Sequence, residues 1–94
     1  MSVKVMIPTP LRAYAGKQAS VDLQAATVGE ALAGLTAQFA DLKKHLFTDD
    51  GRLRSFVNVY VNDEDIRYLQ KDQTQVREGD TISIVPSIAA GSIG

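Results

Sequence analysis

The chain has 94 residues and a formal net charge of −1, which fits one domain and gives no broad attraction to nucleic acid or an anionic membrane. It contains no cysteine, so disulfides, thiolate zinc sites, cysteine-ligated iron–sulfur clusters and a cysteine nucleophile are excluded. No run of about 20 apolar residues is present and the N-terminus does not look like a signal peptide, so we expect a cytoplasmic protein.

The N-terminal quarter is expected to form a β-hairpin. Apolar residues alternate with others over residues 3–7, which predicts a strand that Pro8 ends. A polar connection with proline and glycine follows, and residues 20–23 alternate again. The two strands therefore pair.

A helix is expected to begin at Thr27. Thr27 and Glu30 have the spacing of a capping box, in which the Thr27 hydroxyl accepts from the Glu30 N–H and the Glu30 side chain reaches back to the Thr27 N–H. Apolar residues at helical spacing follow for three turns, and residues 42–47 predict a short further turn. Gly29 and Gly34 each cost roughly 1 kcal/mol relative to alanine within a helix, so they predict close packing of another backbone.

Three more strands are expected in the C-terminal half. Residues 57–61 alternate valine with larger or polar side chains, and residues 66–68 predict a short edge strand after an acidic turn. A Gly-Asp turn then precedes a last strand over residues 81–85. The order predicts an α+β, ubiquitin-like roll: a mixed sheet with one main helix on one face and the first and last strands paired in the middle.

Nothing in the sequence has the pattern of a catalytic or metal site. His45 is the only histidine and has no serine, paired carboxylate or second histidine beside it. The cluster Asp63-Glu64-Asp65 lacks the spacing of a calcium loop, so it reads as a solvated turn or as an acidic rim for a basic partner. We therefore expect a protein that is not an enzyme and that holds no metal or bound cofactor.

The basic residues are scattered along the chain. The nearest to a cluster is Lys43-Lys44, with Arg52 and Arg54 further on. This pattern is typical of a solvated face and does not predict a phosphate-binding track.

One face of the predicted sheet turns away from the helix and carries several large side chains. We expect the residues of this partner-binding face to be Met6, Phe56, Tyr60 and Val85, with Lys4, Asn58 and Ser83 around them. Scattered surface hydrophobes need no explanation, but four on one small face are suited to binding another protein.

The end of the chain is the most unusual segment. We place the domain at residues 1–86 and a flexible tail at residues 87–94, made of Ser87, Ile88, Ala89, Ala90 and the residues after them. Disordered termini are usually polar and charged, whereas this one is slender, mildly apolar and without an ionisable side chain. Such a tail fits a narrow channel on another protein.

Three segments resemble a known family. FVNVYVNDEDIR (residues 56–67), EGDTISIVPSIA (residues 78–89) and the opening VKVMIPTPLR (residues 3–12) are similar to the small MoaD/ThiS-family sulfur carriers. The similarity extends over essentially the whole chain and is greatest to the actinobacterial members that supply cysteine biosynthesis. It implies a β-grasp fold and a carrier role.

The resemblance also implies a chemistry for the tail. In this family an E1-like adenylyltransferase uses ATP to adenylate the terminal glycine carboxylate, and sulfur then replaces the adenylate to give a thiocarboxylate. That sulfur passes to an accepting synthase. The family usually ends in Gly-Gly, and the aligned pair here is Ala90-Gly91, followed by three more residues.

This departure implies that the carrier is made as a precursor. The implied activation site is Gly91, exposed by cleavage between Gly91 and Ser92, and in some extended relatives a zinc-dependent JAMM-type peptidase makes that cut. Activation at Gly94 is the alternative. Two other functions stay open: the small subunit of molybdopterin synthase, and a non-catalytic ubiquitin-like module that binds partners through its sheet face alone.

Overall fold

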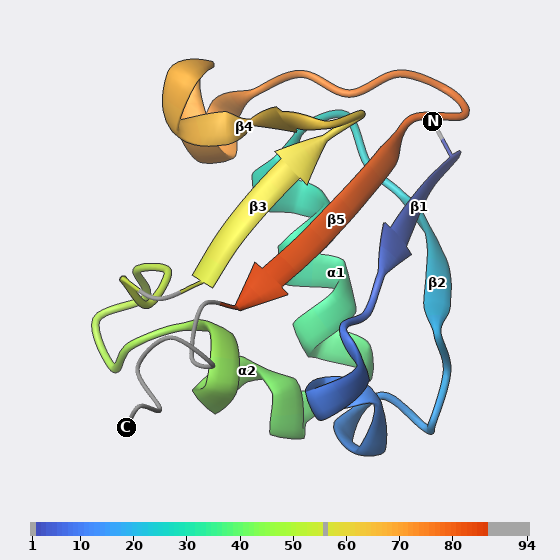
Figure 1. Ribbon diagram of the computed structural model, residues 1–94, viewed down its shortest axis with the longest axis vertical. Coiled ribbons are helices and arrows are strands. Elements are labelled where there is room, and N and C mark those ends of the chain that lie inside the picture. Colours follow the sequence, from blue (N-terminus) through green and yellow to red (C-terminus); the bar gives the residue numbers. More distant parts are fainter. Residues whose placement is uncertain (1, 56, 87–94) are drawn as a thin grey trace.

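The computed structural model in Figure 1 describes residues 2–55 and 57–86. Its strands and α-helices are β1 (Ser2–Met6), β2 (Ser20–Gln24), α1 (Val28–Gln38), α2 (Ala40–Leu46), β3 (Val57–Val61), β4 (Glu64–Asp65) and β5 (Thr81–Pro86). Three 3₁₀ turns complete the described chain: η1 (Thr9–Tyr14), η2 (Ile66–Tyr68) and η3 (Lys71–Gln73). The predicted tail, residues 87–94, lies outside the described residues.

The strands form one mixed sheet in the order β2-β1-β5-β3-β4. β1 and β5 pair in parallel at its centre, whereas β1–β2, β3–β5 and β3–β4 are antiparallel. In Figure 1 the sheet lies in front of α1, which crosses behind the central strands. The predicted ubiquitin-like roll, its hairpin and its central pairing of first and last strands are confirmed.

The core lies between the sheet and the two helices. Strand residues alternate between buried and more exposed, which is what a sheet covered on one face requires. The largest side chains that are almost fully buried are Ile7, Leu32, Leu35, Leu42, Leu46 and Ile82. Because Leu42 and Leu46 belong to α2, the predicted extra turn is a short helix that closes one end of the core.

The start of α1 follows the prediction with one difference. The Thr27 hydroxyl accepts from the Glu30 N–H at 3.2 Å, as in a capping box. The Glu30 carboxylate accepts instead from the N–H of Ala26, at 2.9 Å. The carboxylate therefore reaches one residue further back than in a capping box, to the residue before Thr27, which itself bridges to Gln75.

The predicted edge strand over residues 66–68 is wrong. The edge strand is β4, two residues earlier, because Asn62 and Asp63 both take positive φ (49° and 76°) and reverse the chain at once. After β4 the Asp65 carboxylate accepts from the Arg67 N–H at 2.9 Å and caps the 3₁₀ turn η2. This cap favours a turn over continued strand at residues 66–68.

Close packing is confirmed at one of the two helix glycines. A Cβ on Gly29 would lie 3.0 Å from the carbonyl oxygen of Asp72, so a side chain there would press η3 away from α1. A Cβ on Gly34 would meet only the Leu23 side chain, at 3.8 Å, which is an ordinary contact. The prediction is wrong for Gly34.

Candidate functional site

The sheet surface opposite α1 carries most of the predicted partner-binding face. The strand register places Met6 beside Ser83 and Ser83 beside Tyr60, so the three side chains form a row across β1, β5 and β3. Met6 and Tyr60 are half-buried. Val85, the next residue of β5 after Ser83 on the same face, is 44% exposed. The structure therefore brings Met6, Tyr60 and Val85 together, whereas Phe56 lies outside the described residues.

The polar surroundings of this face are close to neutral. Lys4 is exposed on β1, opposite Asp22 of β2 and Thr81 of β5. Asn58 is the β3 neighbour of Val85. Because these charges are paired, the apolar side chains of Met6, Tyr60 and Val85 suit contact with a partner's own apolar surface.

A carboxylate of the acidic cluster ties the edge of this face together. Asp65 lies opposite Tyr60 in the register and forms an ion pair with Arg67 at 2.8 Å. The side-chain hydrogen bond from Arg67, and then its backbone N–H, hold the pKa of Asp65 below its ordinary value. Glu64 and Asp63 are exposed, so the cluster is one structural carboxylate beside two solvated ones.

The Gly-Asp turn before β5 is fixed to the turn after β3. Asn62 donates to the Asp80 carboxylate at 2.9 Å, and the Thr81 N–H donates back to the Asn62 side chain at 3.0 Å. The bond from Asn62, followed by the one from the Arg77 N–H, lowers the pKa of Asp80. These contacts set the register of β3 against β5, and hence the row that contains Tyr60.

His45 has a packing role. Its ring stacks on that of Tyr14 with centroids 4.1 Å apart, which joins α2 to η1. Over residues 2–55 and 57–86, no three His, Asp or Glu side chains gather into a group that could hold a metal ion. In the same part of the chain, no helix is long and apolar enough to cross a membrane.

The predicted reactive end of the chain stays a prediction. The described chain stops at Pro86, which pairs with Val57 at the end of the sheet nearest α2 (Figure 1). The activation site Gly91, the alternative Gly94 and the cleavage site before Ser92 lie outside the described residues.

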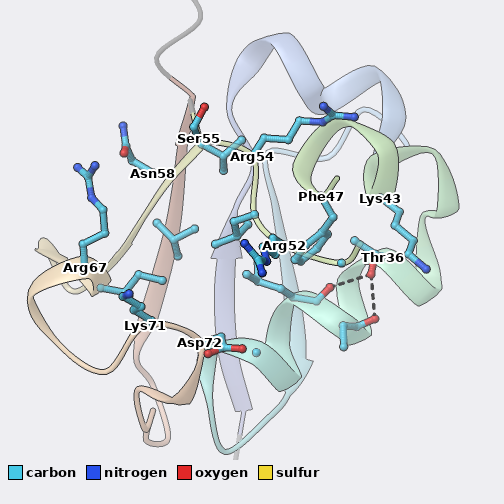
Figure 2. Close-up of a pocket in the computed structure, with 18 of the residues that line it drawn as sticks. Thr36, Lys43, Phe47, Arg52, Arg54, Ser55, Asn58, Arg67, Lys71 and Asp72 are labelled. Carbon is cyan, nitrogen blue, oxygen red and sulfur yellow. Dashed lines mark hydrogen bonds between the residues drawn. The ribbon is translucent and has the colours of Figure 1, made fainter. Parts of the chain in front are cut away.

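One feature was missed from the sequence. A pocket of about 780 Å³ lies between α1, the segment 47–55, β3 and the turns after β4, and Figure 2 shows its lining. Lysines and arginines from four separate segments surround it. The sequence predicts a solvated face at residues 43, 52 and 54, because nothing in it indicates that they meet residues 67 and 71 across a hollow.

Known proteins resemble this chain in both sequence and fold. The ThiS family model matches residues 5–91. The "Sulfur carrier protein CysO" of Mycobacterium tuberculosis H37Rv is 39% identical over 93 residues, covering 97% of this chain and 100% of that protein. A "Putative sulfur carrier protein" of Archaeoglobus fulgidus is 34% identical with the same coverage.

The structural comparison agrees. A chain in the crystal structure of the Amycolatopsis orientalis BexX/CysO complex superposes with a TM-score of 0.84 and 40% identity, over 90% of this chain and 94% of that chain. Sequence and fold therefore lead to the same assignment: the protein belongs to the ThiS family, with a β-grasp fold.

Proposed function

We propose that this protein is a sulfur carrier whose C-terminal glycine is converted to a thiocarboxylate, most directly for cysteine biosynthesis. The observation that carries the proposal is the 39% identity to a CysO sulfur carrier along that protein's whole length. The absence of cysteine is compatible with this chemistry, because the sulfur is held on the terminal carbonyl carbon and needs no thiol of the carrier.

Activation follows from the weak reactivity of a carboxylate. An E1-like partner joins the terminal carboxylate oxygen to the α-phosphorus of ATP, and pyrophosphate leaves. A sulfur nucleophile then attacks the acyl carbon and AMP leaves, so the carboxylate oxygen is exchanged for sulfur. The carrier supplies the acyl group and the partner supplies the catalysis, which is why we do not propose an enzyme.

Gly91 is the proposed site of activation. The ThiS family match ends at this residue, which supports a working terminus there and removal of residues 92–94. The five residues from Ser87 to Gly91 span at most about 17 Å, enough to carry the carbonyl into a partner's site while the sheet stays outside. Small side chains at Ala89 and Ala90 lower the steric demand of that entry.

The sheet face formed by Met6, Tyr60 and Val85 is the proposed docking surface for the E1-like enzyme and the accepting synthase. Its support is that these side chains lie together on the surface of the sheet that faces away from α1. The relative seen in the BexX/CysO complex gives a precedent for a carrier of this fold assembled with another protein.

Intact-mass measurement tests the proposal. The full chain and a chain ending at Gly91 are each incubated with the host's E1-like enzyme, ATP and a sulfur source. We expect the shorter chain to gain one sulfur in place of one oxygen, and the full chain to do so only after a zinc peptidase removes residues 92–94. A full chain charged without trimming would move the site to Gly94, and no charging of either chain beside a working control carrier would refute the function.

The acceptor is tested with the charged carrier. When a cysteine-forming synthase and its amino-acid substrate are added, we expect the thiocarboxylate sulfur to bond to that substrate and give a carrier adduct of higher mass. Hydrolysis of the acyl bond then releases the sulfur-bearing product and returns the carrier to its carboxylate. Transfer only to a molybdopterin synthase large subunit would assign the chain to the other pathway.

A further inference from the structure

We propose that the pocket between α1 and β3 is a second docking site, which binds an acidic segment of a partner protein through one apolar side chain and several carboxylates. The proposal rests on described residues alone and does not depend on sulfur transfer, because the tail takes no part in it.

The floor of the pocket is apolar. Leu32 of α1, Val59 of β3 and Ile66 of η2 line it and are almost fully buried. Phe47 and Leu53 of the intervening segment are only partly buried and form its side. At about 780 Å³ the space exceeds what a single side chain needs, and apolar walls of this kind favour an apolar anchor.

The mouth of the pocket is strongly cationic. Its lining holds five of the chain's ten lysines and arginines but only one of its eleven aspartates and glutamates, Asp72. The chain as a whole carries a net charge of −1, so positive charge is concentrated at this hollow. A neutral or basic ligand would gain nothing from that arrangement.

The cations differ in how far they are already neutralised. Arg67 is paired with Asp65 at 2.8 Å, and Arg52 lies 3.6 Å from Asp50 with both side chains largely exposed. Arg54 donates to the Lys44 carbonyl at 2.8 Å, which holds its guanidinium in place without cancelling its charge.

Lys43 and Lys71 stand at opposite walls of the pocket, on α2 and η3 (Figure 2). An acidic peptide that crosses the mouth can present a carboxylate to each wall. We therefore favour a multiply charged segment over a small amphipathic acid.

β3 separates this site from the sheet face. Val57 and Val59 project toward the pocket and Tyr60 projects to the opposite surface, while Asn58, the β3 neighbour of Val85, also lines the pocket. A partner held in the pocket therefore leaves the row of Met6, Ser83 and Tyr60 open.

A peptide titration tests the site. The probe is a fluorescently labelled, end-blocked peptide with one leucine flanked by two glutamates on each side, and it is added to the full chain at low salt. We expect saturable binding with backbone amide shifts at Leu32, Ala33 and Val59. The variant Lys43→Glu with Lys71→Glu should weaken binding about tenfold or more, because two favourable charge contacts become repulsive.

Two matched controls make the result specific. Lys17→Glu with Lys44→Glu changes the net charge by the same amount at exposed positions outside the pocket lining, one of them beside Lys43 on α2, and should keep the affinity within about threefold. A peptide with serine in place of leucine should bind far more weakly to the unaltered chain.

Four outcomes would overturn the proposal: no saturable binding, equal losses in both double variants, equal binding of the serine peptide, or shifts confined to the sheet face. Displacement of the peptide by decanoate at equal affinity would also overturn it, and would reassign the pocket to a small amphipathic acid.

Discussion

The two surfaces of β3 differ in shape and charge. The surface opposite α1 is an open sheet face with Met6, Tyr60 and Val85, bordered by two opposite-charge pairs, Lys4 with Asp22 and Asp65 with Arg67. The surface toward α1 borders a hollow with an apolar floor and five cationic side chains. Because strand side chains alternate, neighbouring residues of one five-residue strand serve both surfaces.

This difference teaches that the two surfaces suit different contacts. The sheet face can bury apolar area against a partner with little electrostatic selection, whereas the pocket selects for negative charge and depends on salt. The two can therefore be disabled one at a time. The predictions below do so, beginning with the largest expected effect.

The strongest prediction concerns Tyr60. Tyr60→Ala should weaken binding of the E1-like partner by about 2 kcal/mol, or roughly 30-fold, because a central aromatic side chain of the docking face is lost. It should leave the acidic peptide's affinity for the pocket unchanged. Isothermal titration calorimetry with each ligand measures both.

The control for Tyr60→Ala is Tyr60→Phe, which keeps the apolar ring and should bind nearly as well. Tyr60→Asp is a poorer test, because it would place two carboxylates opposite each other, at positions 60 and 65, and destabilise the strand pair. Unchanged affinity of a folded Tyr60→Ala variant for the E1-like partner would remove the sheet face as the docking surface.

The second prediction compares the two glycines of α1, of which Gly29 lines the pocket and Gly34 does not. Gly29→Ala should lower the free energy of unfolding by about 1 kcal/mol, because the new methyl group meets the Asp72 carbonyl and overpacking outweighs the gain in helix propensity. Gly34→Ala, with room for its methyl group, should raise it by about 0.5–1 kcal/mol. Urea unfolding midpoints measure both.

Opposite signs for the two glycines would confirm that η3 is pressed against the start of α1, where it forms one side of the pocket. If both substitutions stabilise the protein, the wall yields easily and the pocket is less fixed than the contact distance implies.

The sequence predicted the sheet face better than the pocket, for a physical reason. Alternation at residues 57–61 and 81–85 is local, so it assigns Tyr60 and Val85 to one surface as soon as the strands are paired. The pocket depends on residues 43, 52, 67 and 71 meeting across segments that have no common period. Only the tertiary packing of α1, β3 and the two 3₁₀ turns brings them together.

The errors in the local predictions have a similar origin. The edge strand was misplaced because its position depends on two residues with positive φ and on the Asp65 cap, which residue type alone does not settle. Gly34 was misread because a helix glycine indicates close packing only where a neighbouring backbone is present.

The smallest expected effect concerns the carboxylate that links the two surfaces. Asp65 faces Tyr60 across the β3–β4 pair and forms an ion pair with Arg67 of the pocket lining. Its pKa is lowered from the ordinary 3.8, so folding favours the ionised form. The stability it contributes is fully present above about pH 4 and is lost as the pH falls through the lowered pKa of the folded state.

Asp65→Asn should therefore lower stability at pH 7 and flatten its decline below pH 4, while Glu64→Gln, at the exposed neighbour, should change neither. Urea midpoints measured from pH 7 to pH 2 compare the variants. Equal declines in the Asp65→Asn variant and the unaltered chain would mean that other carboxylates, such as Asp80 with its own lowered pKa, cause the acid sensitivity. In that case the ion pair positions Arg67 at the pocket without contributing to the pH dependence of folding.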